Sequence, residues 1–166
     1  MPSGNPVLQD IIANIVTTMQ AINGTPDYYT AIPIANVFVA SHAAMLDNPN
    51  IVPCVYVVPQ GASIDAPRGG ASPYRINQLF SFGMYGKLVL YTNVRSDTMH
   101  VQIEQLVRDA HRAFGLDPTR GGLAVDSRIT GYEMIYPTDE SDAIGGADLS
   151  FEVWYRTLRD DLNTPH

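Results

Sequence analysis

The chain has 166 residues, a size that suits one domain with a single hydrophobic core and that needs no disulfide or metal to stay folded. Its formal net charge is −7 with Lys87 as the one lysine, which argues against a protein that wraps a nucleic-acid backbone. Charged residues make up only 16%, against about 25% in a typical soluble domain, and this leaves neutral surface that a subunit of an assembly can bury. The single cysteine, Cys54, excludes an intrachain disulfide, and its apolar neighbours predict a buried, unreactive thiol.

The first predicted element is an amphipathic helix over residues 5–22. Asn5 is a favourable N-cap and Pro6 suits the first helical position. Apolar residues then recur at helical spacing, and Gly24 can end the helix in the left-handed conformation. The preceding residues lack the basic and apolar regions of a signal peptide, and no apolar run reaches membrane-spanning length, so we expect a soluble protein made in a reducing compartment.

The next region, residues 25–50, predicts one or two short strands around Val37. Pro33 interrupts this run and favours an edge or a bend. Residues 41–46 fit a short helix and a loop equally well. The pattern therefore places a minor, peripheral part of the sheet here.

A hairpin is predicted over residues 59–93. It follows a strand at residues 51–58, which are rich in β-branched side chains. Residues 59–73 contain glycines and prolines without an apolar period, which is typical of a long exposed loop or of the tip of an extended hairpin. Residues 78–93 predict a strand long enough to reach beyond the core, with internal glycines that suggest a bulge or a close backbone approach. The hairpin should thus protrude from the domain.

The second half begins with another amphipathic helix. Ser96 is the predicted N-cap, and Gly115 is the expected stop. Residues 116–122 predict a tight turn into a strand at residues 123–136. The apolar phase of that strand changes at Gly131, which predicts a bulge there.

The last predicted strand covers residues 147–156. Apolar residues alternate with polar ones, so one face of this strand should be buried. Trp154 breaks the polar phase on the other face. It packs either under a loop of its own chain or against another subunit. Residues 158–166 predict a frayed, flexible tail.

Together these elements predict an α+β domain over residues 1–166. The strands should form a mainly antiparallel mixed sheet, with two amphipathic helices packed on one face and a protruding hairpin. The apolar stripes of the helices are expected to pack on Leu149, Phe151 and Val153. Burial of these apolar surfaces, at about 25 cal/mol per Å², should supply most of the stability.

The histidines and acidic residues, which most often act in catalysis or bind metals, show no catalytic spacing in this sequence. The histidines show no paired zinc spacing, and His100 and His111 fall off the apolar stripe of their helix, where solvent is the expected neighbour. Acidic residues gather in the loop before the last strand, but without the alternating spacing of an EF-hand, so a solvated acidic loop is expected. We therefore predict no enzyme activity, no cofactor and no metal. A small-molecule-binding domain or an enzyme that uses a pocket between helix and sheet remains an alternative.

In the second half of the chain, a helix ends at Gly115, and the sequence LDPTRGGL follows at residues 116–123. A strand, an acidic loop and a terminal strand reading A-x-L-x-F-x-V-x-Y-R at residues 147–156 come next. In this order the elements resemble the tail terminator proteins of tailed bacteriophages, and the opening amphipathic helix and the proline-containing strand fit the same outline. The resemblance covers most of the chain in the order of its elements, and its specific part is about two dozen residues.

This resemblance implies a structural virion protein. Such proteins assemble as a ring of six that caps the head-proximal end of the tail tube, stops its polymerisation and joins it to the head connector. The implied partners are copies of the chain, the tail tube protein and the head-completion or connector protein, with DNA only as passing cargo. The implied location is the tail or neck of the virion, after assembly in the host cytoplasm, with no membrane partner. Another phage neck protein, for tail completion or head–tail joining, is the nearest alternative.

The ring hypothesis assigns roles to two segments. The hairpin should insert against the next subunit, and the acidic loop should face the lumen. Solvated loops without a role are the competing interpretation for both. The candidate interface residues are Arg68, Tyr74, Arg75, Phe82 and Trp154, and the candidate lumen residues are Asp139, Glu140 and Asp142.

Overall fold

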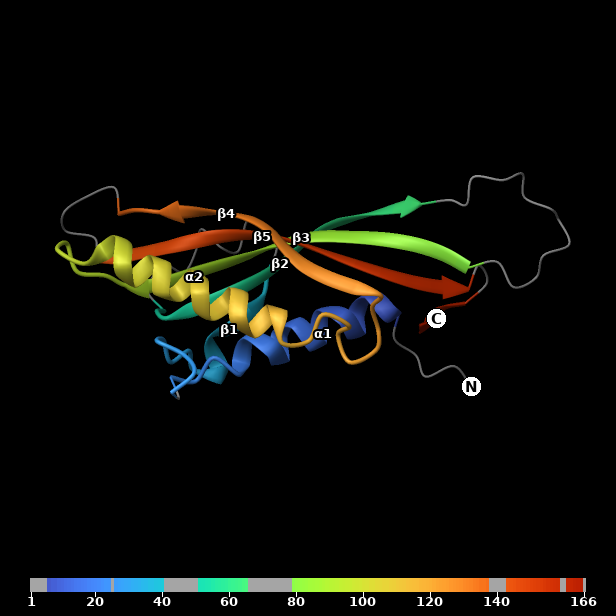
Figure 1. Ribbon diagram of the computed structural model, residues 1–166, viewed down its shortest axis with the longest axis horizontal. Coiled ribbons are helices and arrows are strands. Elements are labelled where there is room, and N and C mark those ends of the chain that lie inside the picture. The colour runs from blue at the N-terminus through green and yellow to red at the C-terminus, as the bar shows by residue number, and fades with distance from the viewer. Residues whose placement is uncertain are drawn as a thin grey trace, which may run out of the picture.

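The protein is an elongated sheet with two helices on one face, as the computed structural model in Figure 1 shows. The structure describes residues 6–24, 26–40, 51–65, 79–137, 143–158 and 161–165. The elements are α1 (Val7–Gln20), the 3-10 turn η1 (Ile34–Asn36), β1 (Val37–Val39), β2 (Cys54–Asp65), β3 (Leu79–Asn93), α2 (Met99–Gly115), β4 (Asp126–Ile135), β5 (Ile144–Leu158) and β6 (Asp161–Pro165).

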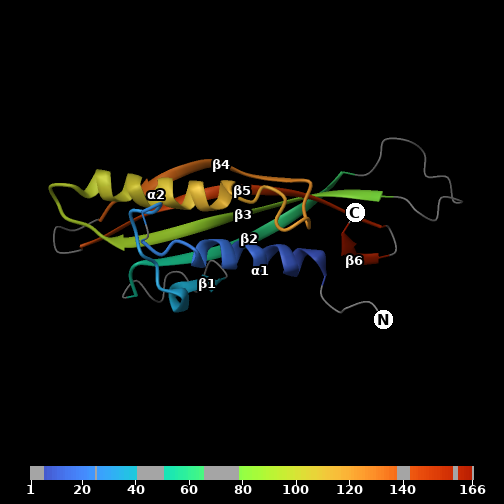
Figure 2. The same cartoon turned by 60° about the horizontal axis from the view of Figure 1, so that its bottom comes forward.

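Within the described residues, six strands form one mixed sheet in the order β1-β2-β3-β5-β4, with β6 paired to β5. The β1–β2 pair is parallel, and the other pairs are antiparallel. Both helices lie against the same face of this sheet (Figures 1 and 2). The predicted α+β class, with a mainly antiparallel mixed sheet and helices on one face, is confirmed.

The main core lies between the helices and β5. Side chains at alternate positions of β5 point toward the helices and are buried, as the sequence alternation predicts. Each fully buried aliphatic or aromatic side chain contributes about 1.5–3 kcal/mol. The cluster includes Ile11, Ile15 and Met19 of α1, Ile103, Leu106 and Phe114 of α2, and Leu149, Phe151 and Val153 of β5.

The helix boundaries differ from the prediction at the N-terminal ends. The helix α1 begins at Val7 with Pro6 as its N-cap residue, while Asn5 lies outside the described residues. The helix α2 is preceded by Thr98, so the prediction of Ser96 as N-cap is wrong. The reason is a turn before the helix, closed by the Thr98 amide, which donates to the Arg95 carbonyl at 3.1 Å. Gly115 is the last residue of α2, as predicted.

The strand β2 runs further than the sequence indicates. Residues 59–73 are predicted to form either a long exposed loop or the tip of an extended hairpin, and the described part agrees with the hairpin, because β2 continues through Asp65 after a register shift between Pro59 and Gly61. Among the described residues, β1 pairs only with Val55–Val57, so Pro59 lies at an unpaired edge where its missing N–H removes no ladder bond. Residues 66–78 of the predicted loop, and the ambiguous residues 41–46, lie outside the described residues.

The C-terminal segment is ordered into a strand. The prediction of a frayed tail over residues 158–166 is wrong for Asp161–Pro165, because β6 turns back and pairs with the end of β5. The pairing of β4 stops where Asp126 lies opposite Trp154, which leaves the last residues of β5 with an open edge. A strand edge presents unpaired N–H and C=O groups, and β6 satisfies part of them.

The predicted bulge in β4 is present. The pairing of β4 with β5 shifts register between Ile129 and Gly131, so Thr130 is the extra residue. No atom outside its neighbours lies within 4 Å of a methyl group placed on Gly131, so this glycine faces open space. The change of apolar phase in the sequence therefore reported a real break in the ladder.

Candidate assembly surface

The most distinctive feature of the molecule is a three-stranded arm. We define the arm as residues 60–65 of β2, 79–86 of β3 and 151–158 of β5, which are paired with one another. Its outer end extends past the helices in both views (Figures 1 and 2), whereas its inner end, at Phe151 and Val153, lies in the core beneath them. The structure thus has the protruding hairpin that the sequence predicts, with β5 as a third strand that the sequence did not place there.

The helix-side face of the arm is apolar. Phe82 stacks on Tyr155 with ring centroids 5.2 Å apart. Ile64 lies opposite Phe82 in the ladder and is 62% exposed. Because the helices end before the tip of the arm, this face carries apolar surface that the subunit covers only in part.

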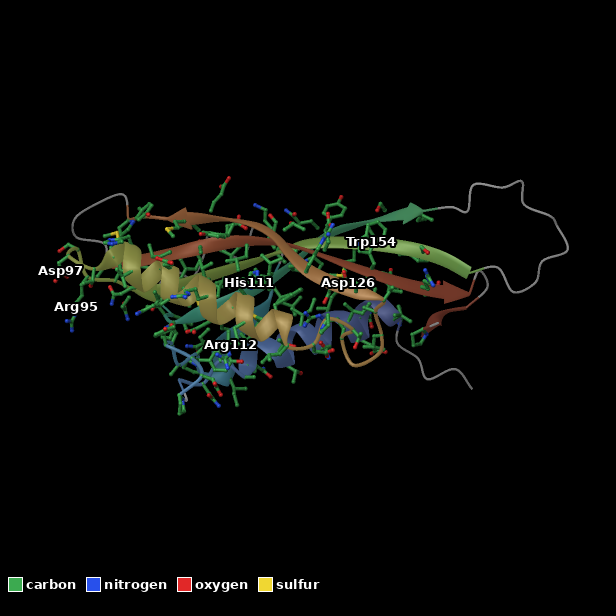
Figure 3. All side chains as sticks on the ribbon, in the orientation of Figure 1. Arg95, Asp97, His111, Arg112, Asp126 and Trp154 are labelled. Carbon is green, nitrogen blue, oxygen red and sulfur yellow. The ribbon has the colours of Figure 1, made fainter. Side chains whose placement is uncertain are left out.

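The opposite face of the arm carries two exposed aromatic side chains. Trp154 of β5 is 37% exposed and Tyr85 of β3 is 47% exposed. A methyl group placed on Gly83 would lie 3.0 Å from the Trp154 indole, and one placed on Gly61 would lie 2.7 Å from the Tyr85 hydroxyl oxygen. Both rings therefore lie across a glycine of the neighbouring strand. Figure 3 marks the position of Trp154.

Further exposed apolar side chains lie in or next to the two outer strands of the sheet, and we call these two groups the β1 border and the β4 border. On the β1 side these are Ile34 and Val39, and on the β4 side they are Val125, Tyr132 and Tyr136. The two outer strands lie at opposite ends of the strand order. The molecule thus presents two different apolar borders.

The buried side chain of Arg120 lies between the end of α2 and the start of β4. Arg120 lies in the 116–122 turn with φ of +51°, followed by Gly121 and Gly122 at +70° and +86°. Its guanidinium donates to the Phe114 carbonyl and, at 2.8 Å, to the Ser127 hydroxyl, and it lies 3.8 Å from the Phe114 ring centroid. Burial lowers the pKa of Arg120 to about 10. The turn thereby fastens the end of α2 to the start of β4.

The sequence analysis predicted this turn but not the burial of its arginine. From its neighbours Thr119 and Gly121, Arg120 is expected to be exposed to solvent, because arginines are rarely fully buried. The only signal in the chain is the pair of glycines after Arg120, which favours a left-handed turn at residues 121 and 122, whereas the positive φ of Arg120 itself has no signal in the sequence.

A second polar attachment joins α2 to the segment after α1. The buried Asp109 carboxylate accepts hydrogen bonds from the backbone amides of Tyr29 and Thr30, at 3.0 and 2.7 Å. One turn away, Arg112 pairs with Asp27 at 2.7 Å, and its position is marked in Figure 3. The sequence analysis missed both contacts, since neither has a short-range pattern.

The helix-free face also has a polar hollow of about 290 Å³ on β3, β5 and β4. Lys87 donates to Asp148 at 2.6 Å inside it, while the second carboxylate oxygen of Asp148 is buried without a donor. The rest of the lining comes from Gly131, Tyr132 and Glu133 of β4 and Ser150 of β5. Among the described residues, no three histidine, cysteine or acidic side chains come close enough to hold a metal ion.

Other residues singled out in the sequence take the expected surroundings. Cys54 is buried, and this burial raises the pKa of its thiol to about 11. His100 and His111 are exposed on α2, and Figure 3 marks His111. These positions agree with the predicted inert thiol and solvated histidines.

Only two of the candidate interface residues lie among the residues that the structure describes. Phe82 and Trp154 both lie on the arm, on opposite faces. Arg68, Tyr74 and Arg75 lie outside the described residues, as do the candidate lumen residues Asp139, Glu140 and Asp142. The sequence analysis did not single out two residues on this surface: Tyr85, which it placed in the long strand, and Ile64, which it placed in a loop or a hairpin tip.

Comparison of the sequence with models of known protein families finds no match. A search of the curated proteins also finds no match. In the described part of the chain, no helix combines the length and the apolar composition needed to cross a bilayer.

Proposed function

We propose that this chain is a structural subunit that assembles with copies of itself into a closed ring. The ring, which we propose to be a hexamer, caps the head-proximal end of the tail tube of a tailed bacteriophage. There it ends tube polymerisation and joins the tail to the head connector. The proposed partners are therefore the tail tube protein and a head-completion protein.

The observation that carries this proposal is the presence of two different apolar borders on one sheet, together with a projecting arm. Val39 of β1 and Tyr132 of β4 belong to these two borders, and both side chains are more than half exposed. A ring requires a head-to-tail contact, in which one surface of a subunit meets a different surface of the next. Two unlike borders at opposite ends of the strand order are what such a contact needs.

The sequence supports the more specific role. The LDPTRGGL turn and the terminal alternating strand resemble tail terminator proteins, and these same segments fix α2 and β5 in the fold. A net charge of −7 suits a ring through which DNA slides without binding, because tight binding requires cations that neutralise phosphates. We assign the acidic residues 139–142 to the lumen on this ground.

The proposal is tested by measuring assembly of the full chain. Native mass spectrometry and negative-stain electron microscopy of the purified protein should show closed rings, either alone or after addition of isolated tail tubes. Tyr132→Arg should shift the population toward monomer, since it places a charge in the β4 border. His100→Arg, also exposed but on α2, is the matched control and should assemble normally.

Circular dichroism of each variant is recorded to check that the fold is retained. A protein that stays monomeric alone and with tail tubes, and that forms no ring in particles containing it, would overturn the proposal. A ring located elsewhere in the neck would keep self-assembly but replace the terminator role by that of another neck protein.

A further inference from the structure

The helix-free face of the arm is flat because of two glycine–aromatic pairs. Trp154 lies opposite Gly83 in the ladder, and Tyr85 lies opposite Gly61. The distances of 3.0 and 2.7 Å from a methyl group on each glycine show that both rings occupy the space a side chain would fill. Two large rings are thus laid along the sheet, one across β3 and one across β2.

We propose that these two rings, Trp154 and Tyr85, form a contact platform on which a second copy of this chain docks. The inference rests on the proposed self-assembly and names the surface that the arm uses. It assigns Gly83 and Gly61 the role of positioning residues, which hold the rings flat without touching the partner.

The surroundings of the platform favour a second copy over other partners. Exposed Asp126 lies opposite Trp154 on β4, and exposed Arg156 follows two residues along β5. Neither forms an ion pair with a described residue, and the rim carries a charge of each sign. A rim of mixed sign does not match a nucleic acid or an anionic membrane, which present one sign of charge.

The chemistry of the platform also fits a protein interface. Aromatic side chains are enriched at the centres of such interfaces, with polar residues around them. The same chain offers apolar borders of low charge, and its composition is only 16% charged, so its own surface is a suitable partner. The platform lies on the helix-free face, where both rings are more than a third exposed and a neighbouring copy can reach them.

Trp154 is the single tryptophan of the chain, so its fluorescence reports directly on the platform. Emission spectra and acrylamide quenching are recorded across a dilution series, while light scattering reports assembly in the same samples. We expect the emission to move to shorter wavelength and the quenching to fall several-fold as the protein assembles. Assembly with unchanged emission and quenching would overturn the platform while leaving the ring intact.

Variants test the positioning role of the glycines. Gly83→Val should lift the indole from the sheet and raise the concentration for half-assembly about tenfold or more, as Trp154→Ala should. Trp154→Phe should recover part of the loss. Leu116→Ala is the control, because this side chain is 69% exposed but lies outside the arm, and it should assemble normally.

The experiment separates failure of the inference from failure of the proposed function. Absence of assembly in the wild type, with and without tail tubes, contradicts the proposed function itself. Normal assembly of folded Trp154→Ala contradicts the platform alone. A blue shift of the dilute monomer on addition of DNA or anionic vesicles would assign the platform to that partner and overturn docking of a second copy.

Discussion

Replacement of the buried Arg120 offers the sharpest test of how the 116–122 turn holds the fold. Arg120→Ala removes the donor to the Phe114 carbonyl and to the Ser127 hydroxyl, both of which lie in the interior. Each acceptor left without a donor costs about 1–3 kcal/mol. Loss of the guanidinium from the Phe114 ring and the cavity left by the side chain add to this.

The opposing term is the cost of burying the charge. Burial lowers the pKa of Arg120 to about 10, so the charged form is disfavoured in the fold, and the variant no longer bears that cost. The net expectation is a loss of about 3–5 kcal/mol in the free energy of unfolding. Arg120→Met fills most of the volume without a charge, and its expected loss is smaller, at about 1–3 kcal/mol.

Urea denaturation followed by circular dichroism measures both variants. Arg128→Ala is the matched control, because its side chain is exposed and its pairing with Glu152 at 3.3 Å is a surface ion pair that should contribute less than about 1 kcal/mol. If Arg120→Ala proved as stable as Arg128→Ala, the argument that this arginine fastens α2 to β4 would be wrong.

Three further substitutions test other contacts. Gly86→Ala should cost about 1–3 kcal/mol, because the added methyl group would lie 2.6 Å from a Phe151 ring carbon, whereas Gly131→Ala faces open space and should leave the melting temperature nearly unchanged. Asp109→Ala should lose about 2–4 kcal/mol and expose residues 28–31 to proteolysis, since two backbone amides lose their acceptor; unchanged cleavage there would refute this. Burial raises the pKa of the Cys54 thiol from 9.0 to about 11, so the unfolded chain loses its proton at a lower pH than the folded chain. The free energy of unfolding of the wild type, relative to Cys54→Ala, should therefore fall by about 2–3 kcal/mol between pH 9.0 and about 11. Equal pH profiles of the two proteins in urea titrations would contradict the burial argument.

Local patterns predicted the elements that local physics controls. The alternation in residues 147–156 predicted the buried face of β5, since successive side chains of a strand point to opposite faces whatever surrounds them. The helical stripe of α2, its end at Gly115 and the bulge at Gly131 followed from periodicity and glycine in the same way. Their tertiary arrangement agrees with the predicted α+β class.

The predictions failed where pairing partners decide the conformation. Residues 60–65 have the composition of a loop, yet β3 pairs with every residue of 61–65, so the segment becomes the edge of the arm. The tail at Asp161–Pro165 becomes β6 for the same reason, because β5 extends past the end of β4. A strand in a sheet is stabilised by its neighbour, and the neighbour is distant in sequence.

The sequence by itself determined the alternating and helical faces of this protein, its low charge and its single tryptophan, because these depend on residues a few positions apart. Only the tertiary structure decided that Trp154 lies across Gly83 and that Arg120 points inward. The first arrangement depends on the approach of two strands that are far apart in the chain, and no short-range pattern records which strands will meet. The second depends on how the turn after α2 brings Phe114 and Ser127 together around the guanidinium, which periodicity does not record.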